Sequence, residues 1–194
     1  MSLSDFSLEN KVALITGGTS GLGKMMALAL AKAGAFVWIA SSRDNADETL
    51  QEIKQQGSNG SFVQVDVTSS DALEKIVSQI LKESNSIDIL VNAAGINLRT
   101  SAEELTLNEW QKTIDINLTA PFYLSQLVAD SMKKNNWGRI INIASLQSLR
   151  AFDNSIPYGA SKGGVMQLTR ALAQAYSKDG ILVNAIAPGF FRTN

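Results

Sequence analysis

Short apolar runs alternate with longer amphipathic segments along most of the chain. We predict strands over residues 12–15, 36–39, 62–65, 87–91, 139–143 and 182–185. Several of these runs are nearly continuous in apolar residues, which is typical of strands covered on both faces. Helix-forming composition predicts helices over residues 21–33, 46–56, 71–84, 120–134 and 157–177. The alternation indicates a single α/β domain with a doubly wound parallel sheet and right-handed crossovers.

The composition narrows the chemistry that the chain can perform. Its 194 residues suffice for one domain, and the net charge of -1 favours neither nucleic acid nor an anionic membrane as a partner. The absence of Cys and His excludes a Ser-His-Asp triad, a thiol nucleophile and the common zinc sites. Acid/base catalysis therefore falls to Asp, Glu, Lys or Tyr. Residues 1–10 lack the pattern of a secretory signal, so we expect a cytoplasmic protein with a small-molecule substrate.

A glycine-rich turn follows the first predicted strand, at residues 16–23. Such a turn lets the backbone approach a pyrophosphate, and the N-terminus of the next helix offers free N–H groups and a partial positive charge. We therefore expect the phosphates of a dinucleotide to contact Gly17, Thr19, Ser20, Gly21, Leu22 and Gly23. The alternative is a turn whose glycines serve only the packing of strand against helix.

The end of the second predicted strand bears on the choice between NAD and NADP. NAD-binding folds commonly place an acidic residue here for the ribose hydroxyls, whereas an Arg suits a 2′-phosphate. Ser41 stands in place of the acid, and Ser42 and Arg43 follow it, which favours NADP. The alternative is that Arg43 is a solvated surface residue whose charge Asp44 neutralises.

Two further turns complete the predicted cofactor site. Asp66 and Val67 follow the third predicted strand, where the carboxylate of Asp66 is placed to accept a hydrogen bond from the adenine amino group. Otherwise Asp66 caps the next helix. Asn92, Ala93 and Gly95 follow the fourth strand, and the small residues of this turn let a flat cofactor pass close to the backbone.

Tyr158 and Lys162 are the candidate acid/base pair. They lie four residues apart in a predicted helix, so that their side chains share one face, and a nearby ammonium favours a phenolate. The same spacing also fits the surface of any amphipathic helix. Ser145 ends the fifth predicted strand, where its hydroxyl either holds a substrate oxygen or caps a turn. Asn117 carries an amide that either binds a proton-relaying water or bridges backbone groups.

Taken in order along the chain, these residues resemble the motifs of the short-chain dehydrogenase/reductase family. The turn from Thr16 to Gly23 matches the family pattern Thr-Gly-xxx-Gly-x-Gly, and Asn92 to Gly95 matches its Asn-Asn/Ala-Ala-Gly. The family's active-site Asn, Ser, Tyr and Lys correspond to Asn117, Ser145, Tyr158 and Lys162. Its residues near the nicotinamide after the sixth strand correspond to Pro188, Gly189 and Thr193.

The resemblance implies a Rossmann-like sheet of strand order 3-2-1-4-5-6-7 and hydride transfer at nicotinamide C4. It implies that Ser145 orients the carbonyl, Tyr158 transfers the proton, and Asn117 supports a proton relay. Lys162 would bind the nicotinamide ribose and favour the phenolate. A homodimer or homotetramer is implied, often through the helices near 120–134 and 157–177. The family also has a seventh strand and a substrate lid, so we expect residues 1–194 to be one catalytic domain without those parts.

Within the family, residues 145–158 and 187–193 resemble gluconate 5-dehydrogenases and related sugar-acid dehydrogenases. Arg99 also falls where those enzymes tend to carry Arg. Arg99, Gln147, Ser148 and Arg150 would form a polar pocket with a carboxylate clamp, unless the two arginines are solvated loop residues. We therefore predict an oxidoreductase that interconverts a secondary alcohol and a ketone, on a sugar acid or polyol such as gluconate.

Other functions remain open on the sequence alone. A 3-oxoacyl-thioester reductase has the same core, and a cofactor-binding protein without turnover is a further alternative. Ser20 stands where many NADP-using members of the family carry a basic residue, and its presence weakens the indication of NADP from Arg43.

Overall fold

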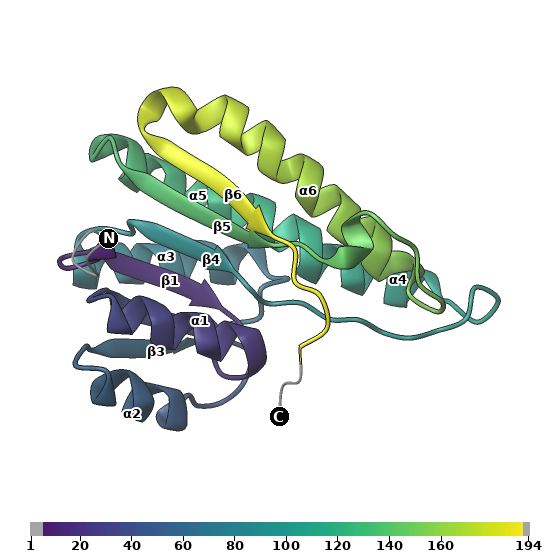
Figure 1. Ribbon diagram of the computed structural model, residues 1–194, viewed down its shortest axis with the longest axis horizontal. Coiled ribbons are helices and arrows are strands. Elements are labelled where there is room, and N and C mark those ends of the chain that lie inside the picture. The colour runs from purple at the N-terminus through teal and green to yellow at the C-terminus, as the bar shows by residue number, and fades with distance from the viewer. Residues whose placement is uncertain (1–5, 192–194) are drawn as a thin grey trace.

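Six parallel strands form one sheet in the order β3-β2-β1-β4-β5-β6 in the computed structural model, which describes residues 6–191 (Figure 1). The predicted doubly wound sheet and its strand order are confirmed for these strands. Their bounds are β1 Val12–Thr16, β2 Phe36–Ser41, β3 Gly60–Gln64, β4 Ile89–Asn92, β5 Gly138–Ile143 and β6 Ile181–Ile186.

Helices cover the sheet in two layers (Figure 1). One layer contains α1 (Gly21–Lys32) and α2 (Asp47–Gln55), and the other contains α3 (Ser70–Ser84), α5 (Ala120–Lys134) and α6 (Ile156–Tyr176). All five were predicted, and each begins and ends within one residue of the predicted range. Within residues 6–191, no helix is long and apolar enough to cross a membrane.

Alternate residues of the central strands pack into opposite layers, which explains their continuous apolar runs. In β1, Ala13 and Ile15 contact the α1–α2 layer, whereas Val12 and Leu14 pack against the layer of α3, α5 and α6. The edge strand β6 differs from the expectation that the strands are covered on both faces. Its residues Leu182 and Ile186 are nearly half exposed, so β6 is covered on one face only by the described residues.

A further helix, α4 (Leu107–Ile114), was not predicted. It begins with a capping box, in which Thr106 Oγ1 accepts from the Glu109 N–H and the Glu109 carboxylate accepts from the Thr106 N–H. It continues through a π-helical turn, η2 (Asp115–Thr119), directly into α5. With the loop before it, α4 forms the part of the molecule that projects beyond the carboxyl ends of the strands (Figure 1).

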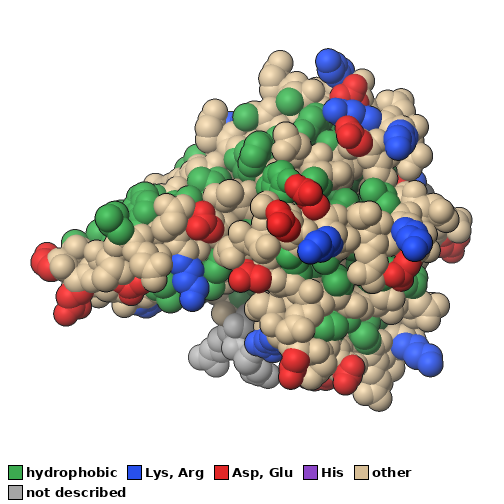
Figure 2. All heavy atoms as spheres, turned by 180° about the vertical axis from the view of Figure 1, so that it is seen from behind, with side chains coloured by type: hydrophobic (Ala, Val, Ile, Leu, Met, Phe, Trp, Pro, Cys, Tyr) green, Lys and Arg blue, Asp and Glu red, His purple; other side chains and the backbone are tan. Residues whose placement is uncertain are grey.

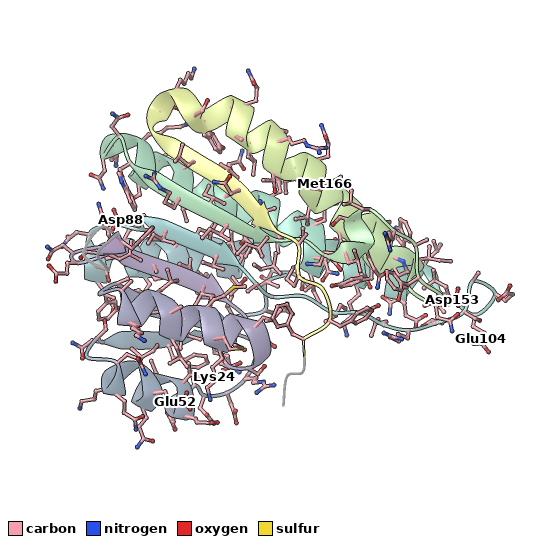
Figure 3. The ribbon with its side chains drawn as sticks, viewed as in Figure 1. Lys24, Glu52, Asp88, Glu104, Asp153 and Met166 are labelled. Atoms are coloured by element: carbon pink, nitrogen blue, oxygen red, sulfur yellow. The ribbon has the colours of Figure 1, made fainter. Side chains whose placement is uncertain are left out.

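Charged side chains mark the ends of the molecule. Glu104 and Asp153 lie at the projecting end, and Asp88 lies at the opposite end of the sheet (Figure 3).

Lys24 of α1 forms ion pairs with Glu48 and Glu52 of α2, at 2.7 and 2.9 Å, which join the two helices of one layer. Acidic and basic side chains are interspersed over the face seen in Figure 2, in keeping with the net charge of -1.

Candidate active site

A cleft of about 630 Å³ lies at the carboxyl ends of the strands. The strand order reverses between β1 and β4, and ligands of doubly wound sheets bind at such a switch point. Most of the predicted site residues line this one cleft: Gly17, Thr19, Ser20, Gly21, Leu22, Gly23, Ser42, Arg43, Asp66, Val67, Ala93, Gly95, Arg99, Ser145, Gln147, Tyr158, Lys162 and Gly189.

The remaining predicted residues are placed elsewhere. Asn92, Asn117, Ser148 and Pro188 are not among the residues that line the cleft, and they support it from behind. The Pro188 carbonyl, for example, accepts a hydrogen bond from the Leu146 N–H at 3.2 Å. Thr193 lies outside the described residues.

The glycine-rich turn is held against the turn that follows β4. Gly17 has a φ of +70°, and a Cβ there would lie 2.9 Å from the Ala94 Cα. A Cβ at Gly23 would lie 2.2 Å from the Gly17 carbonyl oxygen. Both positions therefore require glycine, for conformation and for close packing. These glycines therefore serve the packing of the turn, as the alternative from the sequence proposed. They also line the cleft, so packing and cofactor binding are compatible roles.

The N-terminus of α1 is prepared for an anion. Ser20 is its N-cap residue, yet the Ser20 side chain makes no capping hydrogen bond, and the first turn contains no acidic residue. Side chains cap α3 and α4, through Ser69 and Thr106, whereas α2, α5 and α6 resemble α1 in having no side-chain cap. What distinguishes α1 is that Gly21, Leu22 and Gly23 of its first turn line the cleft, where the helix dipole favours negative charge. This arrangement fits the pyrophosphate of a dinucleotide.

The turn after β2 places a cation at the cleft, the guanidinium of Arg43. Ser41 is buried, and its hydroxyl accepts from the Arg43 N–H at 3.2 Å and lies 3.3 Å from the Thr19 hydroxyl. The Arg43 side chain is exposed and forms no ion pair with any described residue. Asp44 accepts instead from the Asn45 amide, so it does not pair with Arg43.

Asp66 lines the cleft and also organises its own turn. Its Oδ1 accepts from the Thr68 N–H at 2.9 Å and from the Thr68 hydroxyl at 2.8 Å. These hydrogen bonds lower the pKa of the Asp66 carboxyl, so it is ionised at neutral pH. The side chain that caps α3 is Ser69, which accepts from the Ala72 N–H. Asp66 is therefore not the helix cap that the sequence left open.

Thr16 is a supporting residue whose side-chain role was missed. It is 2% exposed, and its Oγ1 accepts from the N–H groups of Ala93 and Ala94, both at 3.1 Å. The signal was a polar residue at the buried end of β1. Asn92 was expected at the cofactor, but its amide points into the core and donates to Asn142 Oδ1 at 2.8 Å. Both residues fix the turn after β4 from behind.

Lys162 and Tyr158 lie side by side on α6. The Lys162 Nζ is 5.6 Å from the centre of the Tyr158 ring, and it donates to the Ile143 carbonyl at 2.5 Å. Lys162 is 4% exposed, and this burial lowers its pKa from 10.5 to about 8. The residue still carries its charge at neutral pH, and it places that charge beside the phenol.

Asn117 lies in the π-helical turn η2 and bridges three segments. Its Oδ1 accepts from the Ile96 N–H, and its Nδ2 donates to the Ile96 carbonyl, each at 2.9 Å. The same Nδ2 donates to the hydroxyl of Ser161 in α6 at 3.1 Å. The backbone-bridging alternative for Asn117 is therefore observed. A Cβ built on Gly95 would be 3.3 Å from Asn117 Oδ1 and 3.7 Å from Lys162 Nζ, so the amide and the ammonium approach the same point.

Ser145 follows β5 and caps a short 3₁₀ helix, η3 (Leu146–Ser148). Its Oγ accepts from the Gln147 N–H at 3.1 Å. Because that bond uses a lone pair of the oxygen, the Ser145 O–H remains available to donate to a ligand in the cleft. The turn-capping role and a ligand-binding role are thus compatible in one hydroxyl.

The four predicted substrate residues separate into two pairs. Arg99 and Gln147 line the cleft, whereas Ser148 and Arg150 do not. Gln147 has a buried Oε1 with no hydrogen-bond partner among the described residues. The Ser148 hydroxyl is already bonded to the backbone of Ser145 and Lys162. Two exposed aromatic residues that sequence reasoning did not select, Phe190 and Phe191, also line the cleft.

The fold and the cleft define a dinucleotide-binding α/β protein that holds Ser145, Tyr158 and Lys162 at one end of the site. Residues 11–194 match the short chain dehydrogenase family model, and the chain belongs to this family. It is an oxidoreductase that acts on alcohol groups. The resemblance inferred from the sequence motifs is thereby confirmed.

Several relatives show the range of the family near this chain. It is 38% identical over 195 residues to 2-dehydro-3-deoxy-D-gluconate 5-dehydrogenase of Escherichia coli, covering 100% of this chain and 77% of that protein. It is 38% identical over 190 residues to a 3-oxoacyl-[acyl-carrier-protein] reductase of Synechocystis, covering 97% and 77%. An NAD-dependent glycerol dehydrogenase of Listeria innocua is 36% identical, covering 95% and 72%.

A solved structure from Beutenbergia cavernae, provisionally assigned as an NAD(P)-dependent gluconate 5-dehydrogenase and holding NADP at low occupancy, superposes with a TM-score of 0.91. The two proteins share 36% identity, over 97% of this chain and 75% of the other. Among these relatives, one therefore holds bound NADP and another is NAD-dependent.

Proposed function

We propose that this enzyme interconverts a secondary alcohol and a ketone on a sugar acid, with NADP(H) as its preferred hydride carrier. The observation that carries the proposal is that Arg99 and Gln147 line the same cleft as Ser145, Tyr158 and Lys162. A guanidinium suits a carboxylate, and an amide suits hydroxyl groups. Only one carboxylate is among the described residues that line the cleft, Asp66, and it belongs to the turn after the opposite edge strand, β3.

The residues of this chain supply the proton chemistry. The nicotinamide cofactor, when bound, donates or accepts the hydride. Tyr158 gives its phenolic proton to the substrate oxygen during reduction and takes one back during oxidation. The free O–H of Ser145 holds the same oxygen, and the buried ammonium of Lys162 stabilises negative charge on the phenol oxygen. Asn117 fixes the turn that passes beside Lys162.

The unpaired guanidinium of Arg43 supports the preference for NADP. The uncapped N-terminus of α1 would hold the pyrophosphate, Arg43 the 2′-phosphate, Asp66 the adenine amino group and Lys162 the nicotinamide ribose. The test is a parallel titration of NADPH and NADH, followed by the fluorescence of each reduced cofactor. We expect NADPH to bind more tightly. Equal or tighter binding of NADH would remove the NADP preference and leave the substrate proposal standing.

The substrate class is tested with a charged substrate and a neutral one. D-gluconate and 5-keto-D-gluconate are assayed beside a neutral polyol, with each cofactor. We expect turnover of the sugar acids, and a fall of about tenfold or more in their kcat/KM in Arg99→Gln, because a hydrogen-bonded charge pair is worth roughly 1.5–3 kcal/mol. Arg150→Gln is the matched control, since Arg150 is exposed and does not line the cleft. No turnover of any sugar acid, whether or not the neutral polyol is turned over, would refute the proposal.

A second candidate is reduction of a 3-oxoacyl thioester. The rings of Phe152 and Phe190 meet edge to face at 6.0 Å, and Phe190 lines the cleft, so part of its mouth is apolar and suits an acyl chain. Turnover of an acetoacetyl thioester with NADPH, in the absence of turnover of sugar acids, would favour this activity over the first.

A further inference from the structure

One hydroxyl joins two members of the proposed catalytic group. The Oγ of Ser148 accepts a hydrogen bond from the Ser145 N–H at 3.2 Å and donates one to the Lys162 carbonyl at 2.7 Å. Ser145 follows the end of β5, whereas Lys162 lies within α6. Ser148 therefore spans the gap between the strand that presents the serine and the helix that presents the lysine.

Lys162 is tied to the β5 segment at both of its ends. Its backbone carbonyl is held through Ser148, and its Nζ donates to the carbonyl of Ile143, the last residue of β5. Ser145 is likewise held twice, because its N–H bonds Ser148 and its Oγ accepts from Gln147. Two of these four hydrogen bonds are made by the Ser148 hydroxyl, and those two connect the serine to the lysine directly.

We propose that Ser148 is a positioning residue, whose hydroxyl sets the distance between Ser145 and the Lys162–Tyr158 pair. This role differs from the substrate contact expected from the sequence. The hydroxyl already makes one donation and one acceptance within the protein, and Ser148 does not line the cleft. The inference rests on the catalytic roles proposed above for Ser145, Tyr158 and Lys162.

Loss of the hydroxyl should affect the rate more than binding. Small displacements of reacting groups reduce rates strongly, and a shift of about 1 Å costs on the order of 100-fold. In Ser148→Ala we expect kcat with D-gluconate and NADP to fall about tenfold or more. The KM for D-gluconate and the affinity for NADPH should stay within about twofold, because the Ser148 hydroxyl bonds neither Arg99 nor Arg43, the residues proposed to hold the substrate carboxylate and the 2′-phosphate. Ser148→Thr keeps a hydroxyl and should recover most of kcat.

A matched control separates positioning from simple destabilisation. Ser131 of α5 is a buried serine whose Oγ, like that of Ser148, accepts a backbone N–H at 3.2 Å, here that of Ile87, and it does not line the cleft. Ser131→Ala should lower Tm as Ser148→Ala does, with kcat unchanged. A second readout is the hydrogen exchange of the Ser145 amide, followed by NMR. We expect faster exchange in Ser148→Ala and wild-type exchange in Ser131→Ala.

The outcomes distinguish the inference from the function on which it rests. An unchanged kcat, a raised KM with unchanged kcat, equal losses of kcat in both alanine variants, or unchanged exchange of the Ser145 amide each overturn the positioning role. Normal turnover in Tyr158→Phe would overturn the proposed catalysis, and this inference with it. Loss of turnover in Tyr158→Phe, with none in Ser148→Ala, overturns the role of Ser148 alone.

Discussion

The buried ammonium of Lys162 makes the stability of the fold depend on pH in a defined window. Burial lowers its pKa from 10.5 to about 8. Below pH 8 the folded and unfolded chains both carry the proton, and the folded state bears the full cost of burying the charge. Between pH 8 and 10.5 the unfolded chain binds more protons, so the free energy of unfolding rises with pH. Above pH 10.5 the cost has disappeared.

Lys162→Met removes the charge and keeps a side chain of similar length. The lowering of the pKa from 10.5 to about 8 corresponds to roughly 3 kcal/mol at neutral pH. The stability of the variant relative to wild type should therefore be greater at pH 7 than at pH 10 by about 2–3 kcal/mol. The variant should also lose turnover, because the ammonium that stabilises negative charge on the Tyr158 oxygen is gone.

The assay is urea unfolding of both proteins at several pH values from 7 to 10. The titrating groups remote from Lys162 are common to both chains, so their contributions cancel in the difference. A difference in unfolding free energy that stays constant across this range would refute the reasoning, because it would mean that the ammonium is as well solvated in the fold as in the unfolded chain.

Three further changes test other parts of the site. Tyr158→Phe should lower turnover by roughly 10²–10⁴, the usual contribution of a general acid/base, while the fluorescence titration with NADPH stays normal; near-normal turnover would exclude Tyr158 as the acid. Arg43→Ala should weaken NADPH binding by about tenfold, through loss of a charged hydrogen bond, and NADH binding much less; equal losses would make Arg43 an ordinary surface residue. Thr16→Val removes the acceptor of two N–H groups, of which that of Ala93 keeps its bond to the Val91 carbonyl and that of Ala94 loses its partner, so it should lower the free energy of unfolding by about 1–3 kcal/mol, seen as a lower urea midpoint; an unchanged midpoint would mean that water replaces the hydroxyl.

The strands could be predicted because burial on two faces leaves a continuous apolar run, and five helices could be predicted from their helix-forming composition. The runs at Val12–Thr16 and Phe36–Ser41 are of this kind, since nearly every residue in both is buried. The helix Leu107–Ile114 was not predicted, although Thr106 and Glu109 have the spacing of a capping box. Its continuation through the π-helical turn Asp115–Thr119 changes the face that the later residues present, which no simple period reveals.

The sequence predicted which residues line the cleft, but it did not predict which groups their side chains hydrogen-bond. Parallel strands deliver their carboxyl ends to one edge, so residues that follow different strands must meet there. The direction of a short polar side chain depends on tertiary distances of a few ångströms. Ser148 therefore bonds backbone groups rather than a ligand, and Asn92 points into the core. Asn117 donates a hydrogen bond to Ser161 across the contact between two helices, which the spacing of the residues in the sequence does not specify.

The uncapped start of α1 links the supply of cofactor to the survival of the protein. A side-chain cap contributes on the order of 1 kcal/mol to a helix, and α1 forgoes this contribution at Ser20. A phosphate that occupies the same N–H groups restores it from outside. At a free cofactor concentration 100 times its Kd, the folded state gains about 2.7 kcal/mol, which lowers the unfolded fraction roughly 100-fold. Starved of dinucleotide, the enzyme should be degraded sooner by any protease that attacks opened chains, so that its abundance follows the pool of its own cofactor.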